Sequence, residues 1–294
     1  MKIIILVPVY NDWKSVSKLI EEINSKVPNL NCHISIMIIN DASTEKQSIY
    51  APNLENIQSI QIINMKENRG HARCIASGLK YIYEKEEFDY IIPMDGDGED
   101  RPEEIKNFVE YLSYDSDKPI VGERVKRSES LFFKFCYSIH KIITFAFTGK
   151  SIKFGNFTCL PKNHVKQLIQ KPFLWNSYSS SIVKTINERT FIPSRRGIRY
   201  VLPSKMNFPA LIFHSLAIIS VFRNAVIIRS IIFLLLYIFL TFNNFSFLSF
   251  IPILFLIFFV LIILKISLRA NMKEFEKSLE NILSIDILSK SNNR

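Results

Sequence analysis

The chain has 294 residues, of which 48% are hydrophobic, and it carries 37 Lys and Arg against 27 Asp and Glu. The net charge of +10 indicates an anionic partner such as a phosphate group, a nucleic acid or a lipid headgroup. Because the basic residues flank hydrophobic segments and form no recognisable nucleic-acid-binding module, a lipid surface is favoured and nucleic acid is not expected as a partner. The four cysteines have no C-x-x-C spacing, which argues against a zinc site or a disulfide framework.

The first hundred residues alternate between strand and helix patterns. Apolar runs predict strands at 2–7, 34–39, 57–63 and 90–94, and the spacing of apolar residues predicts helices over 12–23 and 70–83. This order predicts an α/β domain with a parallel, doubly wound sheet and helices on both faces. The apolar run at the N-terminus is too short for a signal peptide, so we expect the domain, residues 1–203, to be cytosolic.

The pattern from 101 to 203 is less regular. Proline at the first position of a helix followed by two acids predicts that a helix begins at Pro102. Further along, the sequence predicts a short strand at 120–121, an aromatic-rich helix over 131–147 and a strand over 154–160.

Two apolar segments, residues 225–242 and 245–264, are long enough to cross a hydrocarbon core of about 30 Å. Basic residues flank the pair, so the positive-inside rule predicts a two-helix transmembrane hairpin with both ends in the cytoplasm. A pair of buried core helices is the alternative. Residues 204–224 are expected to form an interfacial juxtamembrane helix, although core packing explains the same pattern. Residues 265–294 are expected to be a cytosolic tail of helical composition with a frayed end.

The strongest local motif is Asp95-Gly96-Asp97, which directly follows a predicted strand. Two carboxylates on either side of a glycine form a compact set of oxygen ligands, so Asp95 and Asp97 predict a Mg²⁺ or Mn²⁺ site. A metal ion there would neutralise a departing diphosphate. Acidic pairs in turns are often only solvated, and that alternative applies to the motif in isolation.

Three further motifs stand at the expected carboxyl ends of strands, where α/β sheets bind ligands. Asp41 follows the second strand and could accept hydrogen bonds from a base or ribose, although an ordinary Asx-turn is also possible. Pro8, Tyr10 and Asp12 follow the first strand, where an aromatic ring could flank a base. Arg69 precedes the second helix and would lie near the anionic end of a donor.

Together these motifs resemble those of glycosyltransferase family 2 over residues 3 to about 127. The matching segments are Val7-Pro8-Val9-Tyr10-Asn11-Asp12, Asn40-Asp41-Ala42-Ser43, Glu67-Asn68-Arg69-Gly70 with Ala72, and Asp95-Gly96-Asp97 with Asp100-Arg101-Pro102-Glu103. The resemblance implies a type A glycosyltransferase domain with a Rossmann-like mixed sheet. It also implies that the donor, a nucleotide-diphospho-sugar, is bound by Pro8, Tyr10, Asp12, Asp41, Arg69, Asp95, Gly96 and Asp97.

The segment from Gly122 to Arg127 is similar to the G-x-R-x-x-R motif of polyprenyl-phosphate glycosyltransferases, which include the dolichyl-phosphate mannose synthases. Arginines suit a reaction that brings a diphosphate and a phosphate monoester together. The resemblance implies an acceptor-phosphate site made of Arg124, Arg127, Arg199 and Lys205. The last two come from a basic segment, residues 195–205, whose match to the subgroup is imperfect. A solvated basic face is the alternative for Arg124 and Arg127.

The expected activity is metal-dependent, inverting transfer of a sugar to a polyprenyl phosphate at the cytosolic face of a membrane, the plasma membrane in a bacterium. Asp97, Arg124 and Arg127 are the expected catalytic residues. No Q-x-x-R-W segment is present, so processive synthesis is not expected. An ionised phosphate acceptor also needs no general base. The alternatives are transfer to a glycolipid or polysaccharide hydroxyl and a non-catalytic nucleotide-binding membrane subunit. A homo-oligomer is compatible with the sequence.

Overall fold

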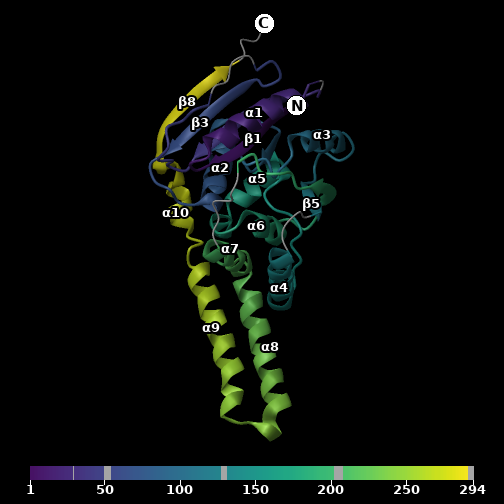
Figure 1. The fold of residues 1–294 in the computed structure, drawn as a ribbon, viewed down its shortest axis with the longest axis vertical. Coiled ribbons are helices and arrows are strands. Elements are labelled where there is room, and N and C mark those ends of the chain that lie inside the picture. The colour runs from purple at the N-terminus through teal and green to yellow at the C-terminus, as the bar shows by residue number, and fades with distance from the viewer. Residues whose placement is uncertain (29, 50–53, 127–130, 202–207, 291–294) are drawn as a thin grey trace.

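The structure is a computed structural model that describes residues 1–28, 30–49, 54–126, 131–201 and 208–290. It consists of an α/β domain built on one eight-stranded sheet and a helical hairpin that projects from one end of the domain (Figure 1). The predicted architecture, an α/β domain followed by two long apolar helices, is therefore confirmed.

The centre of the sheet is parallel and its flanks are antiparallel. The parallel strands are β1 (Lys2–Val9), β2 (His33–Asn40), β3 (Ser59–Met65) and β4 (Tyr90–Pro93), in the spatial order β3-β2-β1-β4. On the β4 side, β6 (Thr158–Pro161) pairs antiparallel with β4 and with β5 (Ile120–Lys126), and β5 pairs parallel with β7 (Thr190–Arg195). The parallel sheet predicted for the first hundred residues and the mixed sheet of a type A domain are therefore both confirmed.

Both faces of the sheet are covered by helices, because its central strands are apolar on both sides. One face packs against α1 (Trp13–Lys26), the 3₁₀ turn η1 (Pro102–Glu104) and α3 (Ile105–Leu112). The other face packs against α2 (His71–Lys85), α5 (Lys162–Ile169), the 3₁₀ turn η2 (Pro172–Trp175) and α6 (Tyr178–Thr185). This double cover fixes the strand ends that carry the motifs.

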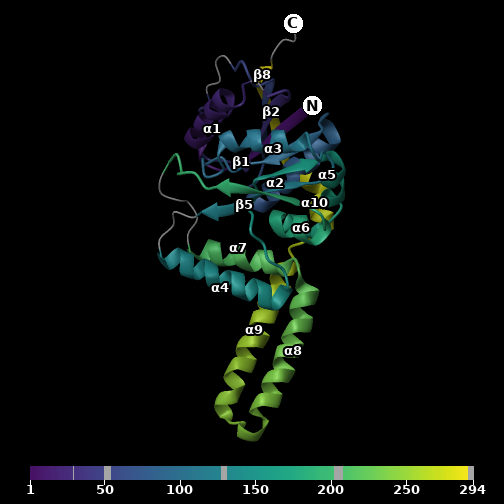
Figure 2. The ribbon, with the colours of Figure 1, turned by 90° about the vertical axis from the view of Figure 1, so that its right-hand side faces the viewer.

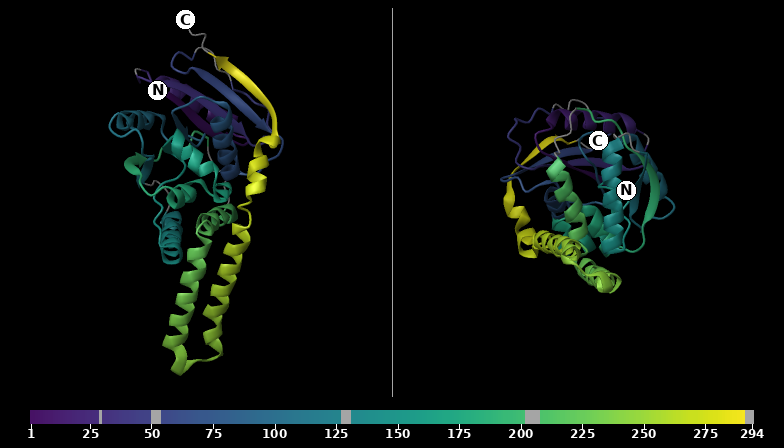
Figure 3. Two further views of the ribbon diagram at one scale, coloured as in Figure 1. Left: turned by 180° about the vertical axis from the view of Figure 1, so that it is seen from behind. Right: turned by 60° about the horizontal axis from the view of Figure 1, so that its bottom comes forward.

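The C-terminal part of the chain returns to the sheet instead of forming a helical tail. A short helix α10 (Met272–Glu276) and a 3₁₀ turn η5 (Lys277–Asn281) lead into β8 (Ile282–Lys290), which pairs antiparallel with β3 (Figure 3). The Asn64 amide donates to Ser284 Oγ at 2.9 Å and to Asp286 Oδ2 at 2.7 Å. The helical expectation for 265–294 was therefore wrong beyond 281, because β8 satisfies backbone groups that would be exposed at the edge of β3.

The hairpin consists of α8 (Arg223–Thr241) and α9 (Phe250–Ser267), joined through the 3₁₀ turns η3 (Phe242–Asn244) and η4 (Phe247–Ser249). The segments Arg223–Asn244 and Phe247–Asn281, which contain α8 and α9, have 22 and 35 residues; the most apolar window in each has a mean hydropathy of 2.5 and 3.2, and only 11% of that window is buried. They are long and apolar enough to cross a membrane. Such low burial is unlike that of core helices in a soluble domain.

Two helices, α4 (Leu131–Thr148) and α7 (Phe208–Ser220), lie crosswise at the root of the hairpin (Figure 2). Ile219, Val226 and Ile263 join α7 to the hairpin in a small apolar cluster. The Arg229 guanidinium, the only charge between 225 and 264, donates to the carbonyl oxygen of Ala146 at 3.1 Å. It thereby satisfies one of the carbonyls left free at the C-terminal end of α4.

Candidate active site

Residues 95–100, here called the acidic turn, follow β4 and contain the Asp95-Gly96-Asp97 motif. Two of the carboxylates in the turn accept hydrogen bonds from its backbone. The N–H of Asp95 donates to Asp100 Oδ2 at 2.9 Å, and the N–H of Glu99 donates to Asp97 Oδ1 at 3.0 Å. A Cβ atom at Gly96 would lie 3.0 Å from Val16 Cγ2, so a side chain there would press tightly against α1. Burial and the neighbouring charge of Asp95 raise the pKa of Asp100 to about 8. Asp100 therefore acts as a buried support of the turn.

Asp95 is oriented by two side chains that the motif analysis did not identify. Its Oδ1 accepts a hydrogen bond from the Asn156 amide at 3.0 Å and lies 3.3 Å from Nε2 of His71, while the Asn156 amide nitrogen and His71 Nε2 are 2.8 Å apart. Although burial opposes ionisation, the contacts with His71 and Asn156 hold the pKa of Asp95 well below its usual range. His71 stands at the start of α2 and Asn156 just before β6, so only the folded sheet brings them together.

Asp97 and Glu99 face two arginines of the segment that follows β7. Arg199 forms ion pairs with Asp97 Oδ2 and with Glu99 Oε1, the latter with its Nε at 3.3 Å, and Arg196 forms an ion pair with Glu99. Burial and the charge of Asp95 raise the pKa of Asp97 to about 6, against the opposing effect of the two arginines. Glu99 is thus a third acidic group of the site, although the sequence analysis assigned it no role.

Asp41 fixes the turn that precedes α2. Its Oδ1 accepts the N–H of Arg69 at 2.9 Å and its Oδ2 accepts the N–H of Gly70 at 2.8 Å. Gly70 has φ +92°, a conformation that favours glycine, and the turn directs the N-terminus of α2 towards Asp95. Burial raises the pKa of Asp41 despite these two hydrogen bonds. Both carboxylate oxygens already serve the backbone, so any contact with a nucleoside would use their remaining lone pairs.

The loops after β1 and β2 are tied together beside this turn. The N–H of Asn11 donates to Ser43 Oγ at 2.9 Å, and Asn11 Oδ1 accepts the N–H of Thr44 at 2.8 Å. Tyr10 is 45% exposed at the strand end, and the charge of Asp12 acts on Asp97. The predicted donor residues Pro8, Tyr10, Asp12, Asp41, Arg69, Asp95, Gly96 and Asp97 therefore surround one edge of the sheet.

Arg124 lies beside the acidic turn. Its guanidinium packs directly on Gly155, where a Cβ atom would overlap Nη2, and its charge helps to lower the pKa of Asp95. Gly155 precedes Asn156, the residue that holds Asp95. Of the other predicted acceptor residues, Arg199 pairs with the acidic turn itself, and Arg127 and Lys205 lie outside the described residues.

His214 is a titratable residue at the root of the hairpin. It stands on α7, and its side chain is exposed.

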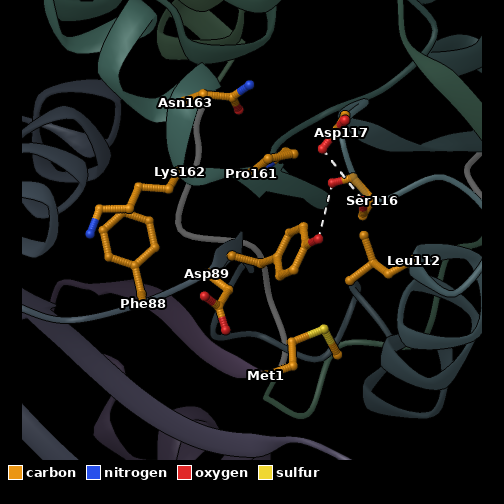
Figure 4. A pocket seen from close by; sticks show the side chains of 10 residues that line it. Met1, Phe88, Asp89, Leu112, Ser116, Asp117, Pro161, Lys162 and Asn163 are labelled. Carbon is orange, nitrogen blue, oxygen red and sulfur yellow. Dashed lines mark hydrogen bonds between the residues drawn. The ribbon is translucent and has the colours of Figure 1, made fainter.

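A shallow depression of about 500 Å³ lies at the opposite end of the strands (Figure 4). Its lining includes Met1, Asp89 and Asp117, and the Tyr90 hydroxyl donates to the carbonyl oxygen of Ser116 at 3.0 Å. These residues stand at the amino ends of β1, β4 and β5, away from the four motifs. The depression is therefore separate from the candidate site.

The donor set suits a hard divalent cation, because Asp95, Asp97 and Glu99 all offer carboxylate oxygens. In the described part of the chain, however, no group of three or more His, Cys, Asp or Glu side chains is arranged to hold a metal ion. Asp97 Oδ2 and Glu99 Oε1 instead form ion pairs with Arg199. The residues fit Mg²⁺ or Mn²⁺ in chemistry and would have to exchange partners to bind it.

A mixed sheet in this order, with an acidic turn at the end of a central strand, defines a type A glycosyltransferase, an enzyme that transfers a sugar from a nucleotide-sugar donor. The comparison with protein families agrees: the model of glycosyl transferase family 2 matches residues 4–165, and the chain belongs to that family.

Among curated proteins, the chain is similar to the undecaprenyl-phosphate 4-deoxy-4-formamido-L-arabinose transferases of Salmonella choleraesuis and Salmonella paratyphi B, each 26% identical over 218 residues. These alignments cover 72% of this chain and 64% of each relative, so the chain spans less than two thirds of their length. Among solved structures, glucosyl-3-phosphoglycerate synthase from Mycobacterium tuberculosis, in complex with Mn²⁺, UDP-glucose and phosphoglyceric acid, aligns with a TM-score of 0.54 at 11% identity, covering 76% of this chain and 79% of that one. This likeness supports the fold.

Proposed function

We propose that the protein transfers a sugar from a nucleotide-diphospho-sugar to a polyprenyl phosphate at the cytosolic face of a membrane. The observation that carries the proposal is the position of Arg124, whose guanidinium packs on Gly155 next to the Asn156 that holds Asp95, in a domain that carries an apolar helical hairpin. A fixed cation between donor and membrane suits an anionic acceptor that arrives from the lipid. The similarity to undecaprenyl-phosphate transferases points to the same acceptor class.

The proposed reaction is one displacement. An oxygen of the lipid phosphate attacks the anomeric carbon, a new C–O bond forms, and the bond to the nucleoside diphosphate breaks with its electron pair leaving on the diphosphate. One such step inverts the anomeric configuration. Asp95 and Asp97 would hold Mg²⁺ or Mn²⁺, which when bound supplies positive charge to the leaving group. Arg124, with Arg127 and Lys205 outside the described residues, would bind the acceptor phosphate.

No general base is required, because a phosphate monoester is already ionised near neutral pH. Asp97 and Arg124 therefore act by charge and position, and neither has to remove a proton from the acceptor. Asn156 and His71 hold Asp95 in place, which keeps the reacting groups in register.

The membrane part of the proposal rests on the apolar surface at the hairpin and its root. The two helices would cross the bilayer, with α4 and α7 at the cytosolic interface. Their exposed side chains are largely apolar and include Phe135, Ile139, Ile142 and Phe145 on α4 and Ile212 on α7. Such side chains would place the acceptor's apolar tail and the active site on the same side of the domain.

The proposal is tested by incubating purified full-length protein with polyprenyl phosphate, Mn²⁺ or Mg²⁺, and a panel of radiolabelled UDP- and GDP-sugars. We expect label in an organic-extractable, acid-labile lipid, and we expect its loss in Asp97→Ala. A matched control is Asp117→Ala, which changes an aspartate at the opposite end of the strands and should keep full transfer. Hydrolysis of a donor without labelled lipid would overturn the acceptor assignment.

A further inference from the structure

The segment after β7 is attached to the acidic turn through its backbone. The N–H of Gly197 donates to the carbonyl oxygen of Glu99 at 2.8 Å, and the N–H of Tyr200 donates to that of Asp97 at 2.9 Å. Gly98, with φ +87°, lies against the Tyr200 ring, where a Cβ atom would come within 2.6 Å of the ring. The Tyr200 hydroxyl in turn donates to Glu22 Oε2 on α1 at 2.7 Å. Residues 196–201, here called the strap, are therefore held against the acidic turn by specific contacts.

The strap brings two positive charges to the carboxylates proposed to bind metal. Arg199 pairs with both Asp97 and Glu99, and Arg196 pairs with Glu99. The side chains of Arg199 and Asp97 are only 21% and 14% exposed, so water screens their attraction weakly. The guanidinium of Arg199 thus occupies carboxylate oxygens that a divalent cation would also use.

We propose that Arg199, supported by Arg196, occupies the place of the divalent cation at Asp97 and Glu99 until the metal and nucleotide arrive. Metal binding and release of the strap from the acidic turn are then one event. This inference rests on the proposed function in one respect, the use of Asp97 as a metal ligand. Arg199 first pairs with the carboxylates proposed to bind metal. It becomes available to a phosphate group only after the metal ion has displaced it.

The exchange has a thermodynamic consequence. A ligand that binds only the open state has its apparent affinity reduced by the fraction of protein that is open. Removing the competing guanidinium should therefore tighten metal binding in the absence of nucleotide, by roughly tenfold if the closed strap predominates by that factor. A residue that served only to bind phosphate would leave this metal affinity unchanged.

The test is a titration of full-length protein in detergent with Mn²⁺ alone, in which electron paramagnetic resonance measures the free aquo ion. Arg199→Gln should bind Mn²⁺ about tenfold more tightly than the wild type, and Arg199→Lys, which keeps the charge, should lie nearer the wild type. Arg195→Gln is the matched control, because Arg195 is an exposed arginine at the end of β7, directly before the strap, and the Mn²⁺ affinity of this variant should not change. Unchanged or weaker binding in Arg199→Gln would overturn the proposal.

Hydrogen exchange of the wild type provides a second measurement that needs no variant. Adding Mg²⁺ should speed exchange at the amides of Gly197 and Tyr200, whose acceptors lie on the acidic turn, and protection that does not change would count against the exchange. The two proposals fail separately. Tighter Mn²⁺ binding by Arg199→Gln without any lipid labelling by the wild type would support the displacement of Arg199 by metal and refute the polyprenyl-phosphate acceptor. Lipid labelling by the wild type together with an unchanged Mn²⁺ affinity of Arg199→Gln would support the acceptor and refute the displacement.

Discussion

Asp41 provides a test of whether this carboxylate supports the site or only contacts the donor. In Asp41→Asn, one of the two oxygens that accept the N–H groups of Arg69 and Gly70 becomes an NH₂ donor facing another donor. Burial raises the pKa of Asp41, so the loss of its charge removes part of the desolvation cost of the buried carboxylate. The mismatch between two hydrogen-bond donors remains. A buried unsatisfied donor costs about 2 kcal/mol, which in a domain of this size lowers the melting temperature by roughly 4–8 °C.

The assay is thermal unfolding of the detergent-solubilised protein without ligands, followed by donor titration. Asp89→Asn is the matched control, because Asp89 Oδ2 also accepts a distant backbone N–H, that of Lys2 at 2.7 Å, but at an exposed position where water can replace it. It should melt close to the wild type. If Asp41→Asn melts with the wild type and only its donor KM rises, the structural role assigned to Asp41 is wrong.

Three further changes have definite expected outcomes. Gly98→Ala should lower the melting temperature and sugar transfer together, because it forces φ +87° on an L residue, at about 1–2 kcal/mol, and drives a Cβ into the Tyr200 ring; equal stability in thermal unfolding would contradict this. Arg229→Leu removes the hydrogen bond to the Ala146 carbonyl, so α4 should lose protection in hydrogen exchange while β1 keeps its own. Truncation after Asn281 exposes the edge of β3, so aggregated protein in size-exclusion chromatography is expected, and a monodisperse, active product would refute the role of β8.

The sequence predicted the parts of the site that come directly after strong strands. Apolar runs before Asp41 and Asp95 fixed where those strands end, and parallel strands bring their carboxyl ends to one edge. The two long apolar helices were equally clear, because their length and composition need no partner to be recognised. Local pattern therefore identified the acidic turn and the hairpin.

Other parts of the site depend on contacts between distant segments, which local pattern does not encode. Asn156 stands in an irregular loop and reaches Asp95 only because β6 pairs antiparallel with β4. Arg199 was expected to bind the acceptor phosphate, whereas in the structure it forms an ion pair with Asp97. The alternation of Leu283, Ile285 and Ile287 was a strand signal in the tail, but the charged residues before it suggested a helix.

The most direct test of the central claim compares two acceptors of the same chain length, polyprenyl phosphate and the corresponding free polyprenol, with one active donor and wild-type protein in detergent. We expect labelled lipid only with the phosphate, at a rate that depends on Arg124, because fixed cations bind an ionised phosphate, which needs no general base. Transfer to the polyprenol at a comparable rate would contradict it and would require a base that removes the hydroxyl proton.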